Sequence, residues 1–334
     1  MHTTIAGAVS LLPPSGYFVH PRAFARADDR TAHSIRPLLD AVRGRILDYE
    51  VATGMDLLCD ELASLRRTLS AERWKAVIDE CRASALRDVV GDAPISRRAA
   101  MRPRGYPGDA ETLDLVYGAG QLPAGLTPLG AALYGYELQM TAAVSVRARR
   151  EILAALIDEV ASQRPDARIL SIACGHVREA ERSEAVASRS FAAFDALDQD
   201  AESLALVERE HAPRGLRPIP GSVRALLAGK VALSDYDLVY AAGLYDYLER
   251  DVAARLTATL FAMLRPGGRL LVANFAYGVR ETAYMEAYMD WPLIYRDESD
   301  VDRFASLIDP AAIAGRRLYR DAPRNVIYLE LQRA

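Results

Sequence analysis

The positions of the hydrophobic residues divide the chain into a helical first part and a second part in which strands and helices alternate. Between residues 34 and 90, apolar residues recur at three- and four-residue steps. Two such series are Met55, Leu58, Leu62, Leu65 and Leu69, and Trp74, Val77, Cys81 and Ala85. This spacing predicts two amphipathic helices that meet near Ser70, whose side chain can cap the second. The helical pattern returns over residues 129–160, and Pro165 ends it.

Short apolar runs then alternate with helical segments such as 251–264. The runs cover residues 169–173, 192–197, 216–219, 237–241 and 269–275. Alternation of this kind predicts βαβ units and a parallel sheet with helices on both faces. Two further runs, 316–319 and 326–331, have so short a link that they must pair antiparallel. We therefore expect an α/β, Rossmann-like fold with an antiparallel C-terminal hairpin, in which residues 1–145 form a helical region and 146–334 the sheet domain.

A loop rich in arginine, glycine and proline lies between the helices, with the sequence Arg-Pro-Arg-Gly-Tyr-Pro-Gly-Asp at residues 102–109. Pro107 and Gly108 suit the central positions of a type II turn, and Asp109 can cap a helix over residues 110–117. The turn and the helix cap give no structural role to Arg102, Arg104 and Tyr106. Such a loop is suited to holding an anionic group or closing over a pocket, although solvated loop arginines are equally common.

A strand, a tight turn and a helix-compatible segment follow one another at residues 168–188. Gly175 stands in the turn, where free backbone N–H groups and a missing side chain let a nucleotide-like cofactor approach. A full dinucleotide fingerprint has three glycines, so an ordinary strand-to-helix connection is an equally open reading of the turn alone. The next predicted strand ends at Asp198, where an acid commonly binds ribose hydroxyls. Asp195 and Asp200 are alternative ligands.

Composition narrows the classes of protein. The chain has 334 residues, of which 51% are hydrophobic and 26% charged, as in ordinary globular proteins. Its net charge of −4 gives no general reason to bind nucleic acid. The 3 cysteines are widely spaced and form no Cys/His cluster, which predicts reduced thiols in a cytoplasmic protein without a metal site. The apolar patch at residues 5–12 is too short to insert stably in a membrane and poorly built for a signal peptide.

The segment Leu-Arg-Pro-Gly-Gly-Arg-Leu-Leu-Val at residues 264–272 is a helix stop, a turn and a buried strand. Here the chain resembles the class I S-adenosylmethionine-dependent methyltransferases, in which the fifth strand commonly follows a Leu-x-Pro-Gly-Gly turn and the sheet ends in an antiparallel hairpin. The resemblance covers about residues 147–331. It implies a methyltransferase with S-adenosyl-L-methionine as its cofactor.

The resemblance also implies cofactor contacts. Those on the methionine side would be Ala173, Cys174 and Gly175, with His176 beside them, and Asp198 would hold the ribose. Ser222 and Val223 would lie near the adenine, Ala241 and Gly243 would line the sulfonium side, and Gln199 is a further cofactor-binding candidate. The turn departs from the family, because Ser171 stands where an acid is frequent and His176, Val177 and Arg178 follow the single glycine. Glu179 and Arg178 are candidates to compensate by binding the methionine ammonium and carboxylate groups.

A narrower resemblance rests on Cys-Gly-His-Val-Arg-Glu-Ala (174–180), the loop at 104–109 and Ala-Ala-Gly-Leu-Tyr-Asp-Tyr-Leu (241–248). These motifs are similar to those of bacterial 3-hydroxypalmitic acid methyl ester synthases, which implies O-methylation of a fatty-acid-like carboxylate. Arg102 or Arg104 would orient the acceptor, and the catalytic candidates are Arg104, Tyr106 and Tyr245. Other aromatic residues expected in the pocket wall are Tyr247, Tyr284, Tyr288, Trp291 and Tyr295.

Three alternatives stay open. The enzyme would methylate nitrogen, carbon or oxygen of a natural-product intermediate, or the chain is an NAD(P)-dependent oxidoreductase, or it is a non-catalytic cofactor-binding protein.

Overall fold

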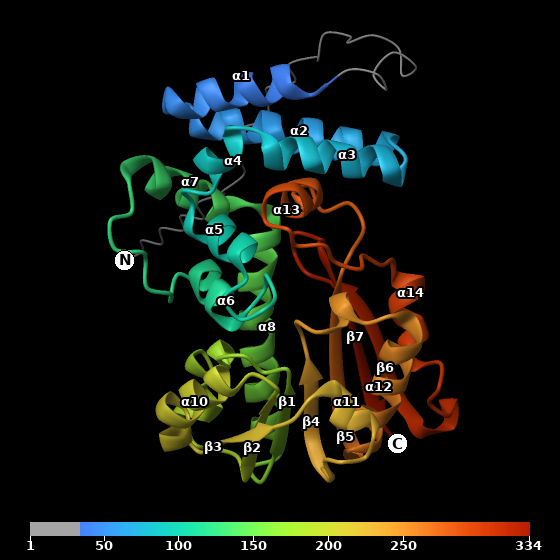
Figure 1. Cartoon of the computed structure of the whole chain (residues 1–334). Coiled ribbons are helices and arrows are strands. Elements are labelled where there is room, and N and C mark those ends of the chain that lie inside the picture. The colour runs from blue at the N-terminus through green and yellow to red at the C-terminus, as the bar shows by residue number, and fades with distance from the viewer. Residues whose placement is uncertain (1–33) are drawn as a thin grey trace, which may run out of the picture. The chain divides into compact units, whose positions relative to one another are not determined.

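The computed structural model describes residues 34–334, and the apolar patch at 5–12 lies outside the described residues (Figure 1). Its centre is a seven-stranded sheet in the order β3-β2-β1-β4-β5-β7-β6. The strands are β1 (Arg168–Ile172), β2 (Ala193–Asp198), β3 (Leu216–Pro220), β4 (Tyr236–Ala241), β5 (Leu264–Phe275), β6 (Ile313–Arg320) and β7 (Val326–Arg333). All seven predicted strands are present.

The strand directions confirm the predicted fold class. Strands β1 to β5 pair in parallel, whereas β7 pairs antiparallel with both β5 and β6. This Rossmann-like arrangement, closed by a reversed seventh strand, is the fold of the class I methyltransferases. Because β7 is inserted between β5 and β6, its residues from Val326 to Leu329 are fully buried, while the arginine-rich β6 forms the edge of the sheet.

Helices precede the sheet and cover both of its faces (Figure 1). Those before the sheet are α1 (Arg36–Leu47), α2 (Val51–Thr68), α3 (Ala71–Ala83), α4 (Leu86–Val90), α5 (Pro94–Met101), α6 (Ala110–Tyr117), α7 (Pro128–Gln139) and α8 (Thr141–Gln163). Those within the sheet region are α9 (Glu184–Ser188), α10 (Ala201–Glu210), α11 (Val223–Leu227), α12 (Arg250–Ala262), α13 (Thr282–Tyr288) and α14 (Glu298–Asp302). Apolar residues of α8 pack on one face of the sheet, and those of α12 pack on the other.

The local signals in the helical part are confirmed. Ser70 Oγ accepts a hydrogen bond from the N–H of Arg73 at the start of α3, and Asp109 Oδ1 accepts one from the N–H of Thr112 at the start of α6. The helix expected over residues 129–160 is divided at Met140, whose extended ψ of 139° separates α7 from α8.

The segment after β1 differs from the expected continuous helix. Val177 has a left-handed φ of +50°, and it is followed by a 3-10 helix (Arg178–Glu181) and the short α9. Val177 is buried, so the chain turns sharply to place this side chain in the core before any regular helix begins. Local periodicity does not reveal such a turn.

The helical part and the sheet share one hydrophobic core, and residues 35–334 form one compact unit. The boundary expected between residues 145 and 146 lies inside α8. Helix α13, which follows β5 and precedes β6 along the chain, contacts α2 and α3. Glu286 on α13 accepts hydrogen bonds from Trp74 Nε1 at 2.7 Å and Arg66 Nη2 at 2.8 Å. Among residues 34–334, the structure has no helix that is both long and apolar enough to cross a membrane.

The carboxylate of Asp237 fastens the start of β1 to β4. Its oxygens accept hydrogen bonds from the Arg168 N–H at 2.8 Å and Arg164 Nη1 at 2.6 Å, and Arg265 Nη2 lies 2.8 Å away. Replacing Asp237 with Ala leaves a strand N–H and two guanidinium groups without their acceptor, so we expect the free energy of unfolding to fall by about 2–4 kcal/mol. Urea denaturation measures the change. The exposed Glu208→Ala is the control, and equal midpoints for the two variants would contradict the assignment.

Candidate functional site

Two adjoining cavities lie at the carboxyl ends of β1, β2 and β4. The wide cavity has a volume of about 360 Å³, and the narrow cavity has a volume of about 70 Å³. Both are lined by Ala110, Leu113, Ile172, Ala173, Gly175 and Gly243, so they form one elongated site. Ligands of open α/β sheets bind at this edge.

Most of the cofactor residues predicted from the sequence meet here. The wide cavity is lined by Tyr106, Ala173, Gly175, Asp198, Gln199, Ser222, Val223 and Gly243. The narrow cavity is lined by Ala173, Cys174, Gly175, His176, Glu179 and Gly243. Ala241 lies outside this group, because its side chain belongs to the buried cluster that contains Leu256 and Leu260 on the other face of the sheet.

The turn after β1 has an unusual backbone. Ala173, Gly175 and Val177 have φ values of +51°, +53° and +50°. For residues other than glycine this conformation costs roughly 1–3 kcal/mol each, so surrounding contacts must maintain it. One such contact is the hydrogen bond from the Gly175 N–H to Asp198 Oδ2, at 2.8 Å. Asp198 is buried, which raises the pKa of its carboxyl group above the ordinary value.

Opposite charges gather at the narrow cavity. Glu179 is buried, which raises its pKa, and its Oε1 accepts a hydrogen bond of 2.6 Å from the Tyr240 hydroxyl. Arg149 reaches the cavity from α8, and its Nη1 donates to the carbonyl oxygen of Ala242 at 2.6 Å. Sequence reasoning missed Arg149. The available signal was a charged residue on the apolar stripe of α8, between Val146 and Leu153.

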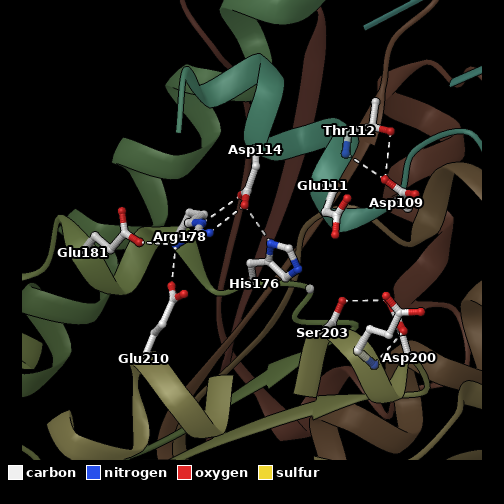
Figure 2. Close-up of polar contacts among 12 residues, drawn as sticks. Asp109, Glu111, Thr112, Asp114, His176, Arg178, Glu181, Asp200, Ser203 and Glu210 are labelled. Carbon is white, nitrogen blue, oxygen red and sulfur yellow. Dashed lines mark hydrogen bonds and ion pairs between the residues drawn. The ribbon is translucent and has the colours of Figure 1, made fainter. Parts of the chain in front are cut away.

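The atypical residues of the turn bind a carboxylate from the helical part (Figure 2). Asp114 on α6 accepts hydrogen bonds from His176 Nδ1 at 2.8 Å and from Arg178 Nε and Nη2 at 2.8 and 2.6 Å. Burial alone would raise the pKa of Asp114, but the hydrogen bonds from Arg178 and His176 outweigh it and hold the pKa below its usual value. The turn is therefore attached to α6.

The same arginine neutralises two further carboxylates (Figure 2). Arg178 Nη1 lies 2.5 Å from Glu181 Oε1 and 3.0 Å from Glu210 Oε2. Among the described residues, Glu181, Glu210 and His211 are the one group with donor atoms close enough to hold a metal ion. Because Arg178 Nη1 already contacts both carboxylates, the arginine balances their negative charge and no metal ion is needed for this.

Arg104 and Arg102 anchor the loop at residues 102–109 and do not line either cavity. Arg104 Nη1 donates to Asp200 Oδ2 and Nη2 to Glu111 Oε1, both at 2.8 Å. Arg102 forms an ion pair with Asp290. The expected role of Arg104 in orienting an acceptor therefore has no support in its position, since acidic side chains surround its guanidinium group. Tyr106, on the same loop, does line the wide cavity.

Tyr247, not Tyr245, reaches the wide cavity. Tyr245 is fully buried, its ring lies 5.0 Å from that of Phe304, and its hydroxyl is 2.9 Å from Thr257 Oγ1. Both tyrosines belong to one 3-10 helical turn (Tyr245–Tyr247), in which residues two apart point in different directions. The position expected for Tyr245 in the site is therefore wrong, and Tyr247 is the tyrosine of this turn that lines the wide cavity.

Gly108 also has a different task from the one expected. Its φ is not positive, as the second central position of a type II turn would require. A Cβ atom there would lie 2.5 Å from Trp291 Cζ2 and 2.9 Å from the Tyr247 hydroxyl oxygen. Trp291 Nε1 in turn donates to that hydroxyl at 2.7 Å. Gly108 is needed so that the loop can approach these two aromatic residues.

A third, apolar cavity of about 50 Å³ lies on the other side of Leu113 from the site, and we call it the apolar slot. Leu113 lines the slot as well as both other cavities. Its other apolar lining residues are Ile95, Val116, Met140, Ala142, Ala143, Val146, Phe275, Met285, Met289, Trp291 and Leu293. Of the expected wall residues, Tyr284 instead lies 2.7 Å from Ser96 Oγ, outside the three cavities.

Two carboxyl groups border the slot, and the protein satisfies both. Glu137 accepts hydrogen bonds from the N–H groups of Ile95 and Ser96 at 3.2 and 2.9 Å. Glu281 accepts them from the N–H and hydroxyl of Thr141 at 3.0 and 2.8 Å. The slot therefore offers a ligand mainly hydrocarbon surface.

Comparison with known proteins gives similar structures but no similar sequence family. No protein-family model and no curated protein matches the sequence. A possible exported protein from Bordetella parapertussis has 16% identity and a TM-score of 0.57, over 93% of this chain and 99% of its own. Magnesium protoporphyrin IX methyltransferase (ChlM) from Synechocystis PCC 6803, with bound SAH, has 12% identity and a TM-score of 0.47, over 66% and 92%. A TehB-like SAM-dependent methyltransferase from Corynebacterium glutamicum has 18% identity and a TM-score of 0.39, over 62% and 100%.

At these identities the similarities concern the fold. The match to the Bordetella protein covers 93% of this chain, so it extends over the helical part as well as the sheet.

Glu137 should make stability depend on pH. Burial raises the pKa of its carboxyl from 4.5 to about 7. Below pH 4.5 the carboxyl is protonated in both the folded and the unfolded protein. Between pH 4.5 and about 7 only the folded protein keeps the proton. The free energy of unfolding therefore falls by roughly 3 kcal/mol as the pH rises through this range. Glu137→Gln should remove this loss. Urea denaturation at pH about 5 and about 8 tests it, and parallel curves for wild type and variant would refute the assignment.

Proposed function

We propose that the protein is an S-adenosylmethionine-dependent methyltransferase that acts on a small molecule. The observation that carries the proposal is the chemistry at the two ends of the elongated site. One end has the acid Asp198 at the tip of β2, which suits ribose hydroxyls, and the other has the opposite charges of Arg149 and Glu179, which suit an amino-acid zwitterion. S-adenosylmethionine has both parts.

The residues present fit this cofactor. Gly175 leaves the turn open, because a Cβ at this position would lie 3.3 Å from Ala110 Cβ. Asp198 would bind the ribose, Ser222 and Val223 would flank the base, and Arg149 and Glu179 would hold the carboxylate and ammonium groups. When bound, S-adenosylmethionine supplies an electrophilic methyl group.

A nicotinamide dinucleotide fits the site less well. Such cofactors place their pyrophosphate at the N-terminus of the helix after the first strand. Here β1 is followed by Val177 in a left-handed conformation and a four-residue 3-10 helix, and the buried carboxyl of Glu179 stands close by. A buried acid disfavours a doubly charged pyrophosphate.

For the acceptor, the proposal is a carboxylate with an apolar part, such as a fatty acid. The apolar slot adjoins the wide cavity through Leu113, and its three methionines can adapt to a flexible chain. Burial raises the pKa values of Tyr106 and Tyr247, so these cavity hydroxyls are poor bases at neutral pH. A carboxylate is already a nucleophile and needs no base.

This acceptor would make the enzyme similar in reaction to the 3-hydroxypalmitic acid methyl ester synthases. The proposal includes a cytoplasmic location and a helical part, residues 35–145, that acts as lid and acceptor region. The loop at 102–109 supports the lid, because it brings Tyr106 to the wide cavity and packs on Trp291. Methylation of a natural-product intermediate at nitrogen, carbon or oxygen is the alternative if carboxylates are not substrates.

Calorimetric titration with S-adenosylhomocysteine and with NAD tests the cofactor. We expect binding of the former only, and Asp198→Ala should weaken it by about tenfold or more because a buried acceptor for the ribose hydroxyls is lost. Asp321→Asn is the control, since Asp321 is equally buried at the β6–β7 turn and lines none of the three cavities. No heat with S-adenosylhomocysteine would refute the proposed function.

Filling the slot tests the acceptor. Ala143→Phe should raise the KM for 3-hydroxypalmitic acid by about tenfold, because the added ring takes the space of the apolar chain. The affinity for S-adenosylhomocysteine should not change. Methyl transfer from labelled S-adenosylmethionine is the measurement, and Ala131→Phe, on the exposed side of α7, is the control. An unaltered KM in Ala143→Phe would exclude the slot as the acceptor site.

A further inference from the structure

The turn after β1 has two left-handed residues that are not glycine, and its conformation must be maintained from outside. Ala173 and the β-branched Val177 have φ values of +51° and +50°. Isolated turns of this sequence would favour other conformations, because a Cβ atom clashes with the backbone in this region. In the observed conformation, Ala173, Gly175 and Glu179 line the narrow cavity.

Two side chains within this turn are held by one carboxylate from outside it. His176 Nδ1 and two nitrogens of Arg178 donate to Asp114, all at 2.6–2.8 Å, and these residues flank Val177 on both sides (Figure 2). Asp114 is buried, as is the His176 side chain. Hydrogen bonds to a charged carboxylate in such an environment are strong and directional.

The other side of His176 is also fixed. Its carbonyl oxygen lies 3.0 Å from Nε2 of His211, so the C-cap residue of α10 contacts the backbone at the same residue. Arg178 Nη1 reaches Glu181 and Glu210. Asp114, however, is the one member of this cluster (Asp114, His176, Arg178, Glu181, Glu210) that comes from the helical part, on α6.

We propose that Asp114 is a positioning residue for the cofactor: through His176 and Arg178 it holds the turn after β1 in the shape that binds the amino-acid part of S-adenosylmethionine. The inference rests on the proposed function. Without Asp114 the turn populates the binding conformation for only a fraction of the time, and the apparent affinity falls by that fraction. The docking of α6 and the retention of the cofactor are thereby coupled.

The effect should be selective for one end of the cofactor. Asp114 borders the narrow cavity and not the wide one. Gly175, which lines both cavities, is held separately by its hydrogen bond to Asp198. A ligand that fills only the wide cavity should therefore lose little affinity without Asp114. A general loss of structure would weaken both kinds of ligand.

The test compares S-adenosylhomocysteine with methylthioadenosine, which lacks the amino-acid part, by calorimetric titration of the full-length protein. In Asp114→Asn and Asp114→Ala we expect the affinity for S-adenosylhomocysteine to fall by about tenfold or more, and that for methylthioadenosine to change by less than about twofold. His176→Asn removes one hydrogen bond of the three and should give a smaller loss with the same selectivity. This variant keeps the test open if the Asp114 variants do not fold.

The matched control is Asp195→Asn. Asp195 is also buried and also accepts three hydrogen bonds, from Arg217 Nε and Nη2 at 2.8 and 2.9 Å and from the Tyr236 hydroxyl at 2.5 Å, but it borders none of the three cavities. It should lose stability and keep both affinities. Equal weakening of both ligands, or an unchanged affinity for S-adenosylhomocysteine, in the Asp114 and His176 variants would overturn the inference while wild-type binding upholds the proposed function. If the wild-type protein binds neither ligand, both fail.

Discussion

Two carboxylates from different segments bind the turn after β1, which lines the candidate site. Asp198, at the end of β2, accepts the N–H of Gly175, and Asp114, on α6, accepts His176 and Arg178. The turn itself has an unfavourable backbone, since Ala173 and Val177 are left-handed. One restraint comes from the sheet and the other from the helical part, so both parts contact the turn that lines the site.

Contacts with α13 and the segment after it attach the helical part to the rest of the protein. Trp74 and Arg66 bind Glu286 on α13, Arg102 pairs with Asp290 beyond it, and Gly108 packs on Trp291. These contacts bring a loop that is distant in sequence to the mouth of the wide cavity. The arginines that looked free for a ligand in the sequence are used for this assembly, because acidic partners from other segments surround them.

At the apolar slot, the buried polar groups form hydrogen bonds within the protein and the apolar groups face the cavity. Glu137 and Glu281 border it, yet backbone N–H groups and hydroxyls of the protein occupy their oxygens. Unsatisfied buried carboxyls would be costly. Their hydrogen bonds fix α5, α7 and the start of α8 around a cavity whose remaining surface is hydrocarbon.

The sequence by itself determined the strands, the two N-caps at Ser70 and Asp109, the antiparallel hairpin and most residues of the elongated site, because these follow from short-range periodicity and from the rule that ligands meet the carboxyl ends of parallel strands. Only the tertiary structure decided that β7 lies between β5 and β6, that Tyr247 and not Tyr245 lines the wide cavity, that Arg104 is paired, and that Arg149 reaches the narrow cavity. These outcomes depend on which distant segments become neighbours. The turn after β1 combines both cases: Gly175 marked its place in the sequence, but the purpose of His176 and Arg178 became visible only when α6 brought Asp114 beside them.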